Sequence, residues 1–447
     1  MTEFRGRTAM EIATSVRDLV ASGVLAAETE LPTVRSLAEQ LGVNRNTVAA
    51  AYALLVKAGV AETNRRRGTR VASIPVVPRE IDWAAVGEVA QRSSERSSGL
   101  VDLASGNPDP ALLPDLRTAF SSGAYETVLY GDAAVDPGLR VWAREQLAPV
   151  VPQAHGYAVA HGAVDAIDRV LGAHLTRSDA VAVEDPCFLA SIGVLRVNGY
   201  RIAPVDTDGD GMIAESLAAA LRHGARAAVI TSRALNPTGA SVSAGRAAEL
   251  RAVLAEYPHV LVIEDDHFSG VATTAYHQVF PPQHPRWALV RSFSKFLGPD
   301  LRLAVVAADP GTITRLETRL AAGATWVSRL LQHTACQLLS DPVVLHQLAQ
   351  AAVAYRDRRG LLIDALGRRG FAVPATETDG LNVWVRLDQP AGPVIARLAG
   401  HGWAVSDGAT YALTDSPLPA LRVTSSALTP DQAEAFTDAL VDACARP

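Results

Sequence analysis

Lysine is almost missing from this chain of 447 residues. Among 41 basic side chains only Lys57 and Lys295 are lysines, and the other 39 are arginines. A chain rich in Ala, Arg and Gly with few lysines is typical of coding DNA of high GC content, so the scarcity is not itself a functional signal. It does restrict any chemistry that needs a lysine amine, such as Schiff-base formation, to two positions.

The surroundings of Lys295 suit such chemistry. It follows the apolar segment WALVRSF in a Ser-x-Ser-Lys turn, and Arg302 comes seven residues later. A lysine near other cations and shielded from bulk water has a lowered pKa and can form a Schiff base. Most single lysines are solvated surface residues, but hydroxyl groups and an arginine beside this one suit a phosphate. Together these neighbours favour pyridoxal 5′-phosphate (PLP) as the ligand.

PLP makes further demands that the sequence meets. A protonated pyridine nitrogen needs a carboxylate, and Asp265 at the end of VLVIEDD is placed for that, with adjacent Asp266 as its competitor. The phosphate needs a helix start with free N–H groups, which HGAVDAIDRVL offers at Ala163 and Val164. Each of these features taken alone is common in proteins, as an acidic loop or an ordinary helix start.

Two more residues complete the set of PLP contacts. Phe188, in EDPCF, offers an aromatic face to the ring, although a core phenylalanine would look the same. Asn236, in NPTG, offers a donor to the phenolic oxygen, although asparagine is also a common turn former.

The elements that must position these residues alternate between helix and strand from residue 101 onward. Short apolar strands are expected at 180–184, 227–232, 260–266, 287–293 and 303–309, with amphipathic helices between them. This alternation predicts an α/β fold with a mostly parallel sheet wrapped by helices. Functional groups should then lie on loops beyond the carboxyl ends of the strands.

The N-terminal residues predict a different kind of module. Helices are expected over 6–23, 33–41 and 45–58, with Thr33 and Asn44 as N-caps and Gly42 in the turn between the last two. Helix, short turn and helix form the helix-turn-helix pattern. A β-hairpin with a basic tip should follow it.

This module carries side chains that suit DNA. Arg45, Asn46 and Thr47 begin the second helix of the pattern, where they would enter a major groove. Phosphate contacts are expected from other residues, namely Arg35, Arg65, Arg66, Arg67 and Thr69. A small helical packing module with a solvated basic loop would share these features.

Charge, hydropathy and cysteine content limit the classes of protein that the chain can belong to. Residues 1–72 hold ten basic and seven acidic side chains, whereas the whole chain has a net charge of −6, so a basic head precedes an acidic body. No apolar run is long enough for a membrane span, and the start lacks the apolar core of a signal peptide. Cys187, Cys336 and Cys444 show no metal-binding spacing, so no metal site is expected, and they suit a reducing cytoplasm.

Two resemblances add to this reading. Residues 31–72, with LP-x-x-R-x-LA, LGV-x-R-x-TV and RGT-x-V, resemble the winged helix of the GntR family. Residues from about 101 to 440 resemble a fold-type I, PLP-dependent aminotransferase of class I/II. The motifs that carry this second resemblance are SGNPDP, YGD, HGAVDAI, EDP-x-F, NPTG, EDD and SFSKFLGPDLR, in the family order.

The second resemblance implies a role for each matching residue. Lys295 would form the Schiff base, Asp265 would pair with the pyridine nitrogen and Asn236 would bond the phenolic oxygen. Phe188 would stack on the ring. The phosphate would be held by Ala163, Val164, Ser292 and Arg302, and by Tyr130 across a dimer interface. Arg422 would clamp the carboxylate of an amino acid, with Gly106 near it.

One position departs from the family pattern. His267 stands where the family usually has tyrosine, two residues after the pyridine-binding aspartate. Histidine can still donate to the phenolic oxygen, but it titrates near neutral pH. The departure bears on transamination more than on cofactor binding.

The fusion of both parts resembles the MocR subgroup of bacterial transcription regulators. The expected organisation is a winged helix at 1–72, a linker at 73–100 and an aminotransferase-like domain at 101–447, whose small C-terminal α+β part starts near 345. The resemblance implies a head-to-tail homodimer that binds promoter DNA and senses PLP, an amino compound or both. The alternative is a working aminotransferase with an accessory DNA-binding head, and the sequence leaves the question of catalysis open.

Overall fold

The structure is a computed structural model that describes residues 4–64, 68–73, 100–121, 125, 127–372, 378–414 and 417–445. The chain divides into two compact units, the first built mainly from its N-terminal 77 residues and the second from most of the remainder. Most of the linker and the expected hairpin tip at 65–67 lie outside the described residues. No described helix is long and apolar enough to cross a membrane.

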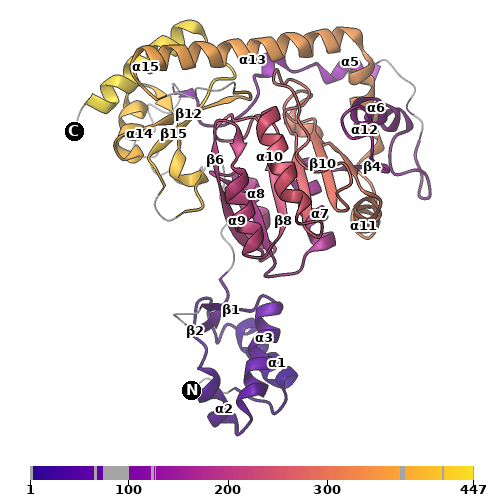
Figure 1. The fold of residues 1–447 in the computed structure, drawn as a ribbon, viewed down its shortest axis with the longest axis vertical. Coiled ribbons are helices and arrows are strands. Elements are labelled where there is room, and N and C mark those ends of the chain that lie inside the picture. The colour runs from indigo at the N-terminus through magenta and orange to yellow at the C-terminus, as the bar shows by residue number, and fades with distance from the viewer. Residues whose placement is uncertain are drawn as a thin grey trace. The chain divides into compact units, whose positions relative to one another are not determined.

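Three helices and a hairpin form the N-terminal unit (Figure 1). They are α1 (Ala9–Ala21), α2 (Val34–Leu41), α3 (Arg45–Lys57) and the antiparallel pair β1 (Ala61–Asn64) and β2 (Gly68–Val71). The helices form because their apolar faces meet in one core, where Ile12, Leu37 and Leu55 are fully buried.

The predicted caps of this unit are confirmed. Thr33 Oγ1 accepts from Ser36 N at 3.1 Å, and Asn44 Oδ1 accepts from Asn46 N at 2.8 Å. Gly42 ends α2 in the left-handed region with φ 65°. These local signals explain why the helix boundaries lie within a few residues of the expected ones.

An eight-stranded sheet organises the second unit. Its order is β4 (Gly156–Ala160), β11 (Ala304–Ala308), β10 (Trp287–Ser292), β9 (Leu261–Asp265), β8 (Ala225–Thr231), β5 (Ala180–Asp185), β6 (Arg201–Asp208) and β7 (Gly211–Met212). The contiguous strands β10, β9, β8 and β5 pair in parallel, whereas β11 is antiparallel to both its neighbours. The expected strands are all present, and they read as continuous apolar runs because helices cover both faces.

The helices of this sheet layer include α7 (Ala163–His174), α8 (Leu189–Val197), α9 (Ala214–Arg222), α10 (Ala244–Ala255) and α11 (Pro310–Ala321). Further helices are α5 (Leu116–Ser121), α6 (Pro137–Leu147) and α12 (Arg329–Ser340). Figure 1 shows α8, α9 and α10 in front of the sheet.

A smaller α+β part completes the second unit. Strands β12 (Asn382–Arg386), β15 (Ala420–Thr424) and β14 (Ser406–Asp407) form an antiparallel sheet, and β13 (Trp403–Ala404) pairs with β3 (Val101–Asp102). Helices α14 (Ala391–Gly400) and α15 (Pro430–Ala445) pack on it. The long helix α13 (Pro342–Arg368) joins both parts, because Leu348 and Tyr355 belong to the main core and Leu362 and Leu366 to the smaller one.

Candidate functional site

The start of α3 presents a polar edge to solvent. Arg45 and Asn46 are exposed and Thr47 is half-buried, while Val48 behind them is fully buried in the core. Arg35 on α2 is also exposed and pairs with Glu39 at 3.0 Å. Thr69 on β2 meets Thr63 through their hydroxyls at 3.1 Å. Arg65, Arg66 and Arg67 lie outside the described residues. The module therefore buries its apolar face and exposes Arg35, Arg45 and Asn46, three of the residues expected to meet DNA.

The second group of predicted residues gathers where the strands of the large sheet end. Asp265 is the last residue of β9, Lys295 follows β10, Asn236 follows β8, and Phe188 follows β5. Parallel strands end at one edge of a sheet, so segments that are far apart in the sequence supply one site. Lys295, Asn236 and Phe188 thus lie beyond strand ends as predicted, and Asp265 is the last residue of its strand.

Asp265 and Asp266, which compete in the sequence, have different surroundings. Successive side chains of a strand point to opposite sides. Asp266 is fully buried and binds Arg233 at 2.7 Å and Arg291 at 2.9 Å. Burial alone raises the pKa of Asp266, but the two guanidinium charges outweigh it and hold that pKa below its ordinary value.

One carboxylate oxygen of Asp265 is available to a ligand. Its Oδ1 is buried and has no hydrogen-bond partner among the described residues. Its Oδ2 lies 3.5 Å from Nδ1 of His267, whose side chain is 18% exposed. A buried acceptor without a donor costs free energy, so it favours a ligand that brings an N–H group. This geometry favours Asp265 over Asp266 as the partner of a pyridine nitrogen.

A polar network links the expected lysine to the expected carboxylate clamp. Lys295 Nζ donates to Gly106 O at 2.9 Å, and Arg422 Nη1 donates to Asn236 Oδ1 at 3.2 Å. Arg422 also donates to the carbonyl of Ala104 and lies 4.9 Å over the ring of Tyr411. The six residues come from β15, from the turn that ends at Tyr411 and from the segments that follow β3, β8 and β10, and tertiary structure alone unites them.

Gly106 is required for this close approach. It has φ +65°, and a Cβ built there would lie 3.1 Å from Arg422 Nη1. Any side chain at this position would strain the backbone and press on the arginine.

The expected phosphate contacts gather at the start of α7. Gly162 is its N-cap with φ +89° and makes no side-chain cap, so the N–H groups of Ala163 and Val164 begin the helix uncapped. A Cβ on Gly162 would lie 2.9 Å from Arg302 Nη2, which donates to the carbonyl of His161 at 3.2 Å. Ser292 Oγ pairs with Ser294 Oγ at 3.2 Å.

Tyr130 does not join this group within the chain. It is 91% exposed and packs edge-on against Trp326 at 5.5 Å between ring centroids. An outward tyrosine is compatible with the expected contact to a second subunit, which a single chain does not test.

Sequence reasoning missed the charged layer beneath Asp265. Tyr276 lies beside two cations, with Arg233 5.8 Å and Arg291 5.5 Å from its ring centroid, and its hydroxyl donates to Glu264 Oε2 at 2.8 Å. Burial raises the pKa of Glu264 to about 7. One signal was available, because Arg291 interrupts an otherwise apolar strand and a buried arginine needs a carboxylate.

The residues present fit PLP. The free Oδ1 of Asp265 suits the ring nitrogen, the uncapped start of α7 suits the phosphate, and Lys295 supplies the amine. When bound, PLP supplies an electrophilic carbonyl and a ring that accepts electron density. The chain supplies the groups that bind and orient it.

Comparison with known proteins defines the class. Residues 98–440 match the family model for aminotransferase class I and II, and residues 8–71 match that for bacterial regulatory proteins of the gntR family. The chain therefore belongs to the class I and II aminotransferase family by its large part and carries a GntR helix-turn-helix domain. This combination makes it a MocR-type, DNA-binding transcription regulator with PLP as the cofactor of its aminotransferase-like domain.

Relatives along the whole chain share this organisation. The chain is 44% identical to the vitamin B6 salvage pathway transcriptional repressor PtsJ of Salmonella typhimurium, over 95% of each chain. It is 26% identical to the pyridoxine biosynthesis transcriptional regulator PdxR of Corynebacterium glutamicum, over 89% of this chain and 87% of that one. Among solved structures, the kynurenine aminotransferase of Pyrococcus horikoshii has a TM-score of 0.72 at 20% identity. That match covers 80% of this chain and 94% of that one and shows the fold.

Proposed function

We propose that this regulator senses PLP, together with an amino compound held by Arg422, and that occupancy of the site changes how its N-terminal unit binds promoter DNA. The observation that carries the proposal is the buried Oδ1 of Asp265, which has no hydrogen-bond partner among the described residues and lies at a strand end of the same sheet as those that Lys295 and Asn236 follow, with Arg422 bound to Asn236. A second support is the exposed polar start of α3 in the same chain, which a plain enzyme does not need.

Each site residue has a part in this proposal. Lys295 would supply the amine for the aldehyde of PLP, Asp265 would accept a hydrogen bond from the ring N–H, and Asn236 and His267 would donate to the phenolic oxygen. Phe188 covers one face of the ring. The phosphate is held by Ala163, Val164, Ser292 and Arg302. Arg422 and the backbone at Gly106 hold the carboxylate of the effector.

On the DNA side, the proposal assigns base contacts to the start of α3. Arg45 and Asn46 suit guanine and adenine in the major groove, and Thr47 suits a thymine methyl group or a phosphate. Arg35, Thr69 and the hairpin tip at 65–67 contact phosphates. The genes controlled belong to vitamin B6 metabolism, a proposal supported by the names of the two relatives PtsJ and PdxR.

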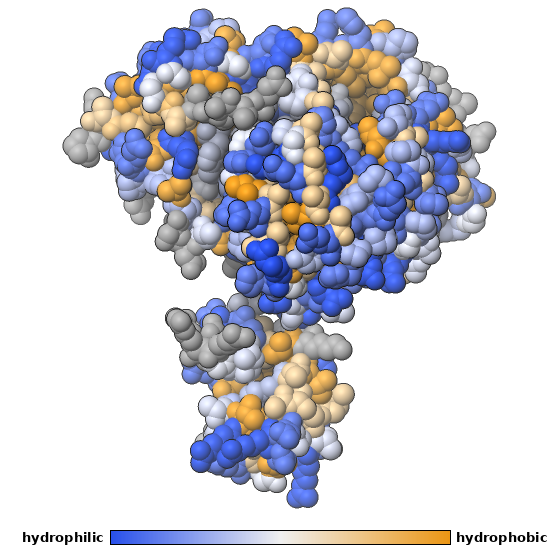
Figure 2. Space-filling model, viewed as in Figure 1, coloured by the Kyte–Doolittle hydropathy of each residue, from blue (hydrophilic) through white to orange (hydrophobic). Residues whose placement is uncertain are grey.

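The proposal includes a head-to-tail homodimer. Large apolar side chains that are exposed on one chain suit such an interface, and they include Leu129 (67% exposed), Tyr130 (91%) and Val343 (74%). Figure 2 shows apolar residues at several places on this face of the large unit, including the region of α5, α6 and α12. Tyr130 of one subunit would then reach the phosphate of the other. Two heads would suit paired half-sites on cytoplasmic DNA.

A promoter-binding assay tests the proposal directly. Full-length protein is titrated onto its own upstream region, with and without PLP, and a Lys295→Ala variant is titrated in parallel. We expect PLP to change the affinity of the wild type several-fold and to leave that of the variant unchanged. Equal affinities for the wild type with and without PLP would refute the sensing role.

A working aminotransferase is the second candidate, because the lysine, the aspartate and the arginine clamp are all retained. The discriminating feature is His267, which stands where the family usually has a tyrosine. Sustained turnover of an amino acid and keto acid pair would support this candidate. Conversion limited to a single half-reaction, or none, would support the sensor.

A further inference from the structure

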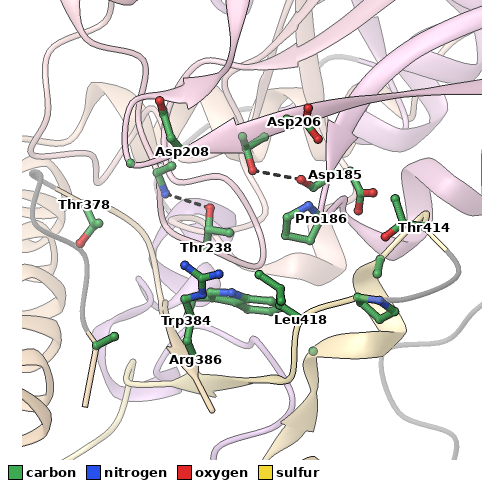
Figure 3. A pocket seen from close by; sticks show the side chains of 17 residues that line it. Asp185, Pro186, Asp206, Asp208, Thr238, Thr378, Trp384, Arg386, Thr414 and Leu418 are labelled. Atoms are coloured by element: carbon green, nitrogen blue, oxygen red, sulfur yellow. Dashed lines mark hydrogen bonds between the residues drawn. The ribbon is translucent and has the colours of Figure 1, made fainter. Parts of the chain in front are cut away.

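A second cavity lies between the large sheet and the small C-terminal part, and none of the residues assigned to PLP lines it. Its volume is about 640 Å³, which is large enough for a small organic molecule. It opens where β5 and β6 of the large sheet face β12 of the small one (Figure 3). Cavities at such junctions are common sites for small ligands.

One wall of this cavity is acidic. Figure 3 shows Asp185, Asp206 and Asp208 along it. Asp208 is neutralised by Arg246, which binds both of its oxygens at 3.0 and 2.7 Å. Within the described part of the chain, no cation forms an ion pair with Asp185 or Asp206. Asp185 and Asp206 therefore line the cavity without an ion pair among the described residues.

The contacts of these two carboxylates come from neutral groups, which for Asp185 include Thr414. Asp185 Oδ1 accepts from the backbone N–H of Leu413 at 3.0 Å, and Asp206 Oδ2 accepts from the hydroxyl of Ser216 at 3.2 Å. Burial raises the pKa of Asp185, and the nearby charge of Asp206 raises it further. A cation placed between them would relieve this repulsion.

The opposite wall is aromatic. Trp384 on β12 lies across from the aspartates in Figure 3. Its ring is fixed from behind, because a Cβ on Gly408 would lie 2.7 Å from it and the ring of Tyr411 meets it edge-on at 6.4 Å. A fixed indole face attracts cations and flat rings. Arg386, two residues along the same strand, is exposed and stands as the one cation of this wall.

We propose that this cavity is a second small-molecule site, which takes a protonated organic amine with a flat ring. The amine would lie at Asp185 and Asp206 and the ring against Trp384. Phosphorylated compounds are disfavoured by the acidic wall, so the cavity and the PLP site would select ligands of opposite charge. This inference does not depend on the sensing role of the PLP site, because the two sites share no residue.

The test uses full-length, PLP-loaded protein and the probe N,N-dimethylbenzylamine. This tertiary amine carries a ring and a positive charge but cannot form a Schiff base with PLP. Benzyl alcohol is the matched neutral probe. Calorimetry should show saturable binding of the amine that weakens with added salt, and much weaker binding of the alcohol.

Variants locate the binding. Asp206→Asn should weaken the amine about tenfold or more, since asparagine can still accept from Ser216 but carries no charge. Trp384→Leu should weaken both probes. Asp442→Asn, which removes an exposed carboxylate of α15, should change nothing. Unchanged affinity in Asp206→Asn, or affinity for the amine no greater than for the alcohol, would overturn the proposal.

Binding at the PLP site would also overturn it, and would appear as loss of amine binding in Lys295→Ala but not in Asp206→Asn. A failure of the proposed function would be seen in a different measurement on the same protein samples. It would appear as loss of promoter response to PLP, whatever the amine does.

Discussion

Some arginines of the two units are used in opposite ways. In the N-terminal unit Arg35 and Arg45 stand in solvent, and the side chain of Arg35 is 73% exposed even in its pair with Glu39. In the large unit Arg233, Arg291 and Arg422 are buried, the last one completely. Exposed arginines remain available to a polyanion, whereas buried ones are committed to a carboxylate, an amide or a carbonyl.

This difference shows how each unit encodes its function. The DNA-binding unit needs a small core and a charged surface, so its functional residues follow from sequence and exposure. The large unit needs charges held in a low dielectric, so its functional residues depend on what surrounds them. Substitutions that remove one charge should therefore change DNA affinity in the first unit. In the second unit they should change PLP affinity or the free energy of unfolding.

The largest effect is expected at the lysine. Lys295→Ala should abolish PLP that is trapped by borohydride, because the large unit contains no other lysine. Mass spectrometry of the reduced protein measures the adduct. Lys57→Ala is the matched control and should retain it. A covalent adduct in Lys295→Ala would show that the assignment is wrong.

The two adjacent aspartates should respond differently. Asp266→Asn should lower the free energy of unfolding by about 3–5 kcal/mol, because it leaves Arg233 and Arg291 buried without a counter-charge. Asp265→Asn should change it by less than about 1 kcal/mol but weaken PLP binding. Denaturant unfolding and PLP titration of both variants measure this. A large loss of stability in Asp265→Asn and weaker PLP binding in Asp266→Asn would mean that Asp266, and not Asp265, is the partner of the pyridine nitrogen.

Within the N-terminal unit, Arg45→Ala should weaken promoter binding about tenfold to a hundredfold and leave PLP uptake unchanged. The control is Arg17→Ala, which removes an exposed arginine of α1. Fluorescence anisotropy with labelled promoter DNA measures the affinities. Equal losses in both variants would mean that the module binds DNA through general charge only.

The last expected effect is a change of stability with pH. Burial raises the pKa of Glu184 from 4.5 to about 7, and the charge of Asp265 contributes to the increase. The folded state then holds this proton between these pH values and the unfolded state does not. The free energy of unfolding should therefore fall as pH rises through that range, by about 3 kcal/mol at most. Glu184→Gln should flatten this decline in denaturant unfolding between pH 4.5 and 7, and an unchanged slope would contradict it.

Much of the fold followed from the sequence because local signals agreed with the tertiary structure. Thr33, Gly42 and Asn44 set the ends of helices by their own hydrogen bonds and dihedral angles. The five expected strands were apolar enough to be recognised, whereas β4 and β6 were not singled out. The strand β6 has an exposed side and a mixed composition, so its pattern is weaker.

Sequence alone could not choose between adjacent residues of the same type as members of the site. Both Asp265 and Asp266 end an apolar strand, and nothing in their order says which one faces a ligand. Asp266 forms ion pairs with Arg233 and Arg291, and these two arginines come from the ends of two other strands. The acidic cavity was not predicted at all, since Asp185, Asp206 and Trp384 are ordinary residues in sequence.

The sequence by itself determined the residue types of this protein: one lysine in the large unit, a polar start to the second helix of a helix-turn-helix, and strands that end in functional side chains. Only the tertiary structure decided which of these groups meet. In the folded chain Asp266 is paired with two arginines, whereas one oxygen of Asp265 has no partner among the described residues. Arg422 is hydrogen-bonded to Asn236, which is 186 residues away in the sequence. The physical reason is that burial makes every unmatched charge costly, so the partners within reach, and not the order of the chain, decide what each group can bind.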